Sequence, residues 1–139
     1  MSQGESVNTE PTASAGATVL IVDDDPEVTH TFSQMLRLSG YQVRVAEDPE
    51  RGLQEALSGG LDAIILDLRM PLLDGVAFLR RLRSDPARRD VPVAIVTGDY
   101  LLDEGVIAEL RTLGVRIVYK PLWLDELVGL TESLVAARG

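Results

Sequence analysis

The sequence reads Ala63-Ile64-Ile65-Leu66-Asp67-Leu68-Arg69-Met70-Pro71 at the point where an apolar run ends on a single carboxylate. An apolar run this short and this rich in branched residues predicts a strand that is buried on both faces. Ligands bind at the carboxyl ends of strands in open parallel sheets, so Asp67 is a candidate site residue. Met70-Pro71 then turns the chain, and we expect Asp74 to cap the next helix.

Length and composition restrict the class of protein. The chain has 139 residues, which is enough for one domain with a full hydrophobic core. It contains no cysteine, which excludes a disulfide framework and a cysteine zinc site. With 13 basic and 22 acidic residues the net charge is −9, which opposes direct binding to nucleic acid or to an anionic membrane surface. The sequence shows no signal-peptide pattern and no apolar run of membrane-spanning length, so we expect a cytoplasmic protein.

The chain divides into an N-terminal tail and one domain. Residues 1–17 are rich in Ser, Thr, Gly, Ala, Glu and Pro without periodicity, which predicts a disordered tail. In residues 18–139, short apolar runs alternate with segments of helical periodicity, and two helices are expected to begin at an Asp-Pro pair, Asp25-Pro26 and Asp48-Pro49. The runs predict strands at 18–22, 41–46, 63–67, 92–97 and 115–119, each followed by a helix. This alternation predicts an α/β fold, a doubly wound parallel sheet of five strands with five helices on its two faces.

Polar residues follow four of the predicted strands and are therefore expected to meet at one edge of the sheet. They are Asp23 and Asp24, Asp67, Thr97, and Lys120. Three neighbouring carboxylates repel one another unless a cation or a hard divalent metal lies between them. Mg²⁺ prefers oxygen ligands, keeps several waters and bridges readily to phosphate. The threonine hydroxyl and the lysine ammonium are donors suited to phosphoryl oxygens, and an aspartate can accept a phosphoryl group.

These residues lie in motifs that resemble the receiver domain of two-component response regulators, including the chemotaxis regulators. The motifs are Val-Asp-Asp-Asp at 22–25, Asp67-Leu-Arg-Met-Pro-Leu-Leu-Asp-Gly, Val96-Thr97-Gly98 and Lys120-Pro121. The resemblance runs from about residue 18 to the last helix. It implies a flavodoxin-like fold with strand order 2-1-3-4-5 and a site at the topological switch point.

The resemblance also implies roles for individual residues. Asp67 is expected to be the phosphoacceptor, and the Mg²⁺ ligands are expected to be Asp23, Asp24, Asp67 and the backbone carbonyl of Arg69. Thr97 is expected to contact the phosphoryl group and couple it to conformation, and Lys120 to bind the phosphate.

Two further positions vary within the family. Receivers usually carry an aromatic residue three places before the lysine, where this chain has Ile117. We therefore assign the output motion to Thr97 and the helix that follows it. Arg69 and Asp99 occupy places that resemble the ones that tune the lifetime of the phosphoryl group. Their opposite charges are expected to pair across the mouth of the site and to restrict the attacking water.

The implied function is a phosphoacceptor that receives its phosphoryl group from a histidine kinase or phosphotransfer protein and signals through protein contacts. It is expected to catalyse only its own phosphorylation and dephosphorylation. A homodimer through the face between the fourth and fifth helices is possible in this family, with Leu101, Leu102 and Trp123 as candidate contacts.

Two other functions remain open. The first is an Mg²⁺-dependent phosphohydrolase with an aspartate nucleophile, for which Asp23 and Asp25 have suitable spacing. No threonine follows that pair where the class expects one, and no inserted segment is present to enclose a substrate. The second is a receiver fold that acts as an interaction module without phosphorylation.

Other polar residues favour simpler interpretations. Asp25 is expected to cap the first helix. His30, the only histidine, is expected to be a surface residue rather than a phosphorylation site. The basic cluster formed by Arg80, Arg81, Arg83, Arg88 and Arg89 has no interleaved aromatic residues, which favours a solvated helix end over a phosphate-binding surface.

Overall fold

Five parallel strands form one sheet. The structure is a computed structural model that describes residues 16–67, 72–98 and 103–138; for Asp67, 72–74 and Arg138 the description covers the backbone alone. The strands are β2 (Thr18–Val22), β3 (Gln42–Ala46), β4 (Ala63–Asp67), β5 (Val93–Thr97) and β6 (Val115–Tyr119). They lie in the order β3-β2-β4-β5-β6, and all neighbours are parallel. Counted along the chain this order is 2-1-3-4-5, which confirms the predicted fold.

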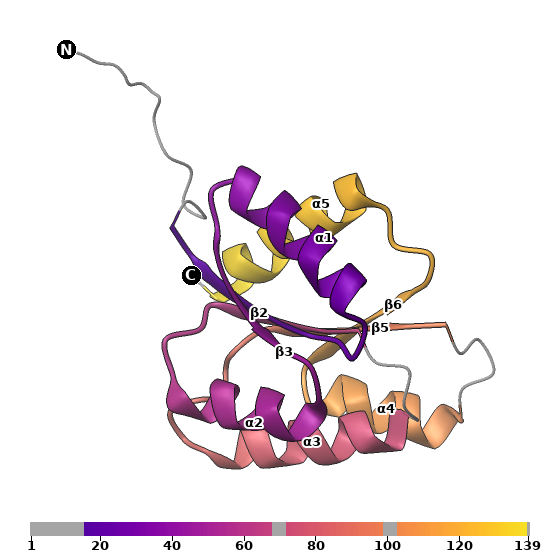
Figure 1. The fold of residues 1–139 in the computed structure, drawn as a ribbon. Coiled ribbons are helices and arrows are strands. Elements are labelled where there is room, and N and C mark those ends of the chain that lie inside the picture. Colours follow the sequence, from indigo (N-terminus) through magenta and orange to yellow (C-terminus); the bar gives the residue numbers. More distant parts are fainter. Residues whose placement is uncertain (1–15, 68–71, 99–102, 139) are drawn as a thin grey trace.

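Helices cover both faces of the sheet. They are α1 (Pro26–Leu38), α2 (Pro49–Ser58), α3 (Leu72–Ser84), α4 (Glu104–Thr112) and α5 (Leu124–Arg138). Figure 1 shows α1 and α5 on one face and α2, α3 and α4 on the other. Each helix runs back from the carboxyl edge of the sheet to its amino edge, so the loops that follow the strands gather at one edge.

Aspartate side chains begin three of the helices. The Asp25 side chain accepts the Glu27 N–H at the start of α1, and Asp48 accepts the Arg51 N–H at the start of α2. Asp103 does the same for α4. These side chains satisfy N–H groups that have no partner within the helix, which confirms the expectation for Asp25.

The start of α3 differs from the prediction. α3 begins at Leu72, which places Asp74 on its third residue, so the prediction that Asp74 caps this helix is wrong. Leu72 and Leu73 are good helix formers, and a proline directly before them in the sequence suits a helix start. The helix therefore begins earlier than its acidic residue suggests.

The sheet separates two hydrophobic clusters. Leu20, Val22, Ile64 and Leu66 belong to the cluster on the side of α2, α3 and α4. The alternate strand residues Val19, Ile21, Ala63 and Ile65 belong to the cluster on the side of α1 and α5. All eight are buried, because a strand covered on both faces has no solvent-facing side.

Helix α2 packs closely on β2 at Gly52. A Cβ added to Gly52 would lie 2.8 Å from Val22 Cγ2 and 3.0 Å from Val22 Cγ1. Val22 is the last residue before Asp23, so the absence of a side chain at Gly52 allows the helix to approach the strand directly beneath the acidic loop.

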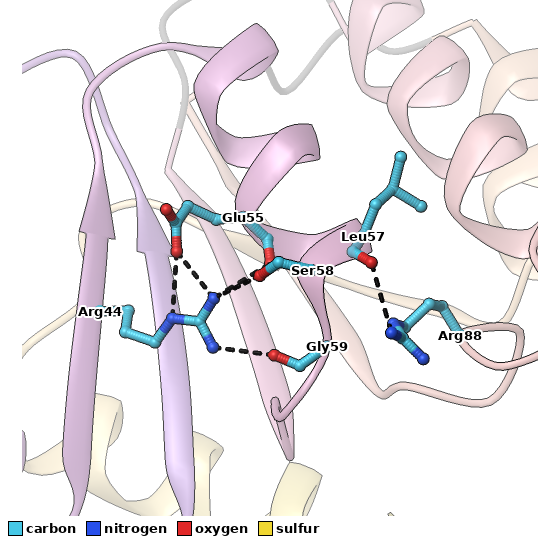
Figure 2. A network of polar contacts seen from close by, with 6 residues as sticks. All are labelled: Arg44, Glu55, Leu57, Ser58, Gly59 and Arg88. Atoms are coloured by element: carbon cyan, nitrogen blue, oxygen red, sulfur yellow. Dashed lines mark hydrogen bonds and ion pairs between the residues drawn. The ribbon is translucent and has the colours of Figure 1, made fainter.

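Two arginines bind the carbonyls at the end of α2, as Figure 2 shows. Arg44 of β3 donates from Nη1 to the Gly59 carbonyl at 2.9 Å and from Nη2 to Glu55 Oε1 at 2.7 Å. Arg88 donates from Nη2 to the Leu57 carbonyl at 3.3 Å. A positive charge at a helix C-terminus complements the helix dipole, so these contacts fasten α2 at the amino edge.

No helix among the described residues is long and apolar enough to cross a membrane.

Candidate functional site

The strand register brings the predicted site residues to one edge of the sheet. Val22 pairs with Leu66, so the next residues along, Asp23 and Asp67, lie level on neighbouring strands. Asp67 in turn pairs with Val96, which precedes Thr97. The site lies where the connections from β2 and β4 lead to opposite sides, which is the usual ligand position in this type of sheet.

Asp23 is held in place by backbone contacts on both sides. Its side chain is buried, and Oδ1 accepts the Asp25 N–H at 2.8 Å. Its own N–H donates to the Ala46 carbonyl at 3.0 Å. The next residue, Asp24, is exposed. The acidic loop therefore offers one buried, oriented carboxylate and one carboxylate that faces solvent.

The donor set at this edge fits Mg²⁺ chemically. Mg²⁺ takes one or two carboxylates and keeps several waters, and Asp23 and Asp24 supply such oxygens beside the backbone of Asp67. Among the described side chains no group of three or more acidic, histidine or cysteine residues is arranged to hold a metal. The carboxylate of Asp67 lies outside that set, and so does all of Arg69.

Thr97 and Lys120 are joined through their backbones. Thr97, the last residue of β5, is 5% exposed, and its carbonyl accepts the Lys120 N–H at 2.7 Å. A Cβ added to Gly98 would lie 3.8 Å from Lys120 Cδ, so the lysine stem passes beside Gly98. The structure thus places Thr97 at the end of β5, the strand next to β4, and Lys120 directly after β6 at the same edge of the sheet.

Ile117 and Tyr119 lie on one face of β6, since side chains on a strand alternate with a period of two. Ile117 is partly buried against the cluster beneath α2, α3 and α4. Tyr119 is 42% exposed at the carboxyl end of the strand. The position of the usual family aromatic residue is therefore filled by a partly buried aliphatic side chain.

Some of the other predicted rim and surface residues lie outside the described part of the chain, and the others are exposed. Asp99, Leu101 and Leu102 lie outside the described residues, as does Arg69. Trp123 is 63% exposed just before α5. The backbone N–H of Trp123 donates to Glu126 Oε1 at 2.9 Å, and this contact holds the Trp123 backbone at the helix start. His30 is an exposed residue of α1.

The basic cluster is largely used within the fold. Arg80 pairs with Glu109 of α4. Arg83 donates to the carbonyls of Leu113 and Val91, at 2.8 and 2.6 Å. Together with the contact of Arg88 to α2, three of the five arginines bind neighbouring elements. We infer that this cluster serves mainly to join helices at the amino edge.

Hollows lie beside two of these features in the described part of the chain. One of about 460 Å³ is lined by Val45, Ala46, Glu47, Asp48 and Arg51, beside the acidic loop. Sequence reasoning missed the contribution of β3, whose last residue, Ala46, accepts the Asp23 N–H with its carbonyl. The register of β2 against β3 is the signal that places the two together, and it is visible only in the folded chain. The other hollow, of about 520 Å³, lies at the amino edge around Arg83 and Gly114.

Comparison with known proteins points to one family. The model of the response regulator receiver domain matches residues 19–132. The transcriptional regulatory protein PrrA of Mycobacterium tuberculosis is 39% identical over 121 residues, which are 87% of this chain and 51% of PrrA. Response regulator MprA of Mycolicibacterium vanbaalenii is 34% identical over 84% of this chain and 49% of its own length. The chain therefore spans about half of the length of these curated relatives.

Solved structures agree with this match. The chemotaxis response regulator CheY4 of Vibrio cholerae has a TM-score of 0.75 and 26% identity, covering 86% of this chain and 99% of its own. The receiver domain of sensor histidine kinase PA1611 from Pseudomonas aeruginosa has a TM-score of 0.73 and 29% identity, covering 88% and 99%. That structure holds a magnesium ion coordinated in its active site cleft.

Proposed function

Because this chain belongs to the response regulator receiver domain family, we propose that it accepts a phosphoryl group on Asp67 from a phosphohistidine donor. The observation that supports this most is the convergence of Asp23, Asp67, Thr97 and Lys120 at one edge of the sheet. The donor is a histidine kinase or a phosphotransfer protein. The modified protein signals by changing its contacts with other proteins in the cytoplasm.

The proposed transfer needs little from the protein beyond position and charge. A carboxylate oxygen of Asp67 attacks the phosphorus in line, the new P–O bond forms, and the bond from phosphorus to the donor histidine nitrogen breaks, leaving that nitrogen's electron pair on the imidazole. Lys120 binds a phosphoryl oxygen with its ammonium group, and the Thr97 hydroxyl donates to another. Asp23 and Asp24 hold Mg²⁺, which when bound neutralises charge on the phosphoryl oxygens.

Dephosphorylation reverses the modification without an external substrate. Water attacks the phosphorus and forms a new P–O bond, the bond from phosphorus to the Asp67 oxygen breaks, and inorganic phosphate and a proton leave as the carboxylate is restored. In this proposal the chain is not an enzyme in the ordinary sense, because it catalyses only the phosphorylation and dephosphorylation of its own aspartate.

The phosphohydrolase alternative is less well supported. It requires the second acid of the Asp23–Asp25 pair as a catalytic group, whereas Asp25 Oδ1 accepts the Glu27 N–H and caps α1. The interaction module without phosphorylation predicts no labelling at all. We also propose the α4 to α5 face as a dimer or partner surface, where Tyr119 and Trp123 are exposed.

The proposal is tested by incubation with acetyl phosphate and Mg²⁺ followed by intact-mass measurement. We expect one phosphoryl group per chain, lost in Asp67→Asn and retained in Asp74→Asn, a matched change a few residues along the chain. Labelling of Asp67→Asn equal to that of the unmodified chain would overturn the assignment. Repeated turnover of a phosphate ester would favour the phosphohydrolase.

A further inference from the structure

Val22, the last residue of β2, is fixed in the sheet directly before Asp23. It is fully buried, and it pairs with Ala46 of β3 on one side and with Leu66 of β4 on the other. Its side chain belongs to the hydrophobic cluster on the side of α2, α3 and α4. A β-branched side chain is stiff about its single torsion, so it does not turn away easily from a neighbour that comes too close. A group that presses on Val22 therefore presses on the end of β2.

Gly52 of α2 faces the whole side chain of Val22. A Cβ on Gly52 would lie 2.8 Å from Cγ2, 3.0 Å from Cγ1 and 3.4 Å from Cβ of Val22. Carbon atoms at their optimal separation lie about 3.5–4.0 Å apart, so even one methyl group at this position would force the helix and the strand apart. Glycine also weakens a helix interior relative to alanine, and the close approach to Val22 is the physical reason for a glycine here.

Helix α2 is held at its carboxyl end, which limits how far it can recede from Val22. Arg44 of β3 donates from Nη2 to Glu55 Oε1 at 2.7 Å and from Nη1 to the Gly59 carbonyl at 2.9 Å, as Figure 2 shows. These contacts tie the last turn of α2 to the edge strand of the sheet. A side chain at position 52 would therefore act between a tied helix and a buried strand.

The amino end of α2 is linked to Asp23 by a second route. Ala46 ends β3, and its carbonyl accepts the Asp23 N–H at 3.0 Å. Only Glu47 and Asp48 separate Ala46 from the first residue of α2, and the Asp48 side chain caps that helix. A retreat of α2 would therefore pull on the carbonyl that holds the Asp23 backbone. Whether the helix or the strand yields, Asp23 is displaced.

We propose that Gly52 is a positioning residue for the Asp23 carboxylate, because its lack of a Cβ lets α2 and β2 approach closely enough to place that carboxylate for Mg²⁺. This inference rests on the proposed function, in which Asp23 is a metal ligand. Mg²⁺ demands near-ideal octahedral geometry, so a small displacement of one carboxylate weakens its binding. Asp23 Oδ1 also accepts the Asp25 N–H at 2.8 Å, and swinging the carboxylate to follow the metal would break that hydrogen bond.

The test measures the Kd of Mg²⁺ by isothermal titration calorimetry on the full chain, without any phosphoryl donor. We expect Gly52→Ala to raise this Kd by about tenfold, the lower end of the range for loss of a group that orients a metal ligand. Circular dichroism shows whether each variant is folded.

Two control variants separate positioning from a general loosening of the fold. Gly129→Ala makes the same change in α5, where an added Cβ meets no described atom within 4 Å. Ala56→Val adds bulk to a buried residue of the same cluster, one turn further along α2 from the acidic loop. Both controls should keep the Kd of the unmodified chain.

A second substitution tests whether the effect passes through Val22. Val22→Ala removes Cγ1 and Cγ2, the two atoms that a Cβ at position 52 would approach most closely. In this background Gly52→Ala should change the Kd by less than about twofold, because the two positions no longer interact. If Gly52→Ala does not fold alone, Gly52→Ala and Gly52→Val are compared in the Val22→Ala background, and the larger side chain should raise the Kd.

Three results would overturn the positioning role. They are an unchanged Kd in folded Gly52→Ala, an equal rise in Ala56→Val, and a tenfold rise that persists in the Val22→Ala background. In the fallback comparison, equal Kd values for the two side chains would overturn it. An unmodified chain that binds no Mg²⁺ is a different result, because it contradicts the proposed function and removes this inference with it.

Discussion

The backbone N–H of Lys120 donates a hydrogen bond of 2.7 Å to the carbonyl of Thr97. This bond lies one residue beyond the end of the β5–β6 ladder, whose last pair is Thr97 and Tyr119. This hydrogen bond fixes the backbones of Thr97 and Lys120 relative to each other, and both residues are proposed to contact the phosphoryl group. Their side chains can therefore act on one phosphoryl group without a large rearrangement of either strand.

The first prediction concerns the charge of Lys120. In Lys120→Ala, transfer from acetyl phosphate to Asp67 should slow by about 10²–10³-fold, because a positioned donor to the developing charge is lost. Arg116→Ala is the matched control, since Arg116 lies on β6, the strand that leads to Lys120, and binds Ser133. The initial rate of labelling is followed by mass. Equal rates in the two variants would show that Lys120 has no role in transfer.

The second prediction concerns Asp23 and Mg²⁺. Without divalent cations, Asp23→Asn should raise the free energy of unfolding by on the order of 1 kcal/mol, because one of several neighbouring like charges is removed. The amide oxygen can still accept the Asp25 N–H. With Mg²⁺ at 100 times its Kd, the unmodified chain should gain about 2.7 kcal/mol and the variant much less.

Urea unfolding with and without Mg²⁺ measures both effects. Asp85→Asn, at the opposite edge of the sheet, is the control and should keep the full gain from Mg²⁺. If Asp23→Asn gained as much as this control, the assignment of Asp23 to the metal site would be wrong.

The third prediction concerns the proposed rim pair, Arg69 and Asp99. If the two charges pair across the mouth of the site and restrict water, Arg69→Ala and Asp99→Ala should each speed dephosphorylation by about two- to fivefold, the range expected for an exposed ion pair. The double variant should be no faster than either single one. Loss of the phosphoryl group is timed after acetyl phosphate is removed. An unchanged dephosphorylation rate in both single variants would contradict the prediction that this pair restricts the attacking water.

The fourth prediction concerns two glycines in helices. Gly52→Leu should lower the free energy of unfolding by about 1–3 kcal/mol, because the new side chain meets the stiff Val22. The same substitution at Gly129 of α5 should raise it by about 0.5–1 kcal/mol, since a Cβ there meets nothing within 4 Å and glycine is a poor helix former. Denaturant unfolding measures both. A stabilising Gly52→Leu would contradict the close approach of α2 to β2.

Most of the fold was predictable because its signals are local. The apolar runs and the Asp-Pro pairs at Asp25 and Asp48 mark strand and helix starts through backbone chemistry that depends on adjacent residues alone. The start of α3 was not predictable in this way. Aspartate is a common capping residue, but the helix begins two residues before Asp74, at Leu72. Residue type shows what a side chain is able to do, and the backbone path decides whether it does so.

The sequence by itself determined that Asp67 ends a buried strand and that acids, a hydroxyl and a lysine follow the neighbouring strands, since these facts are written in consecutive residues. Only the tertiary structure decided that the backbone of Asp23 is held by the Ala46 carbonyl, and that Arg83 fastens the end of α4. Contacts between β2 and β3, or between α3 and α4, join residues that are far apart along the chain. Their geometry is set by strand register and helix packing, which exist only once the whole chain has folded.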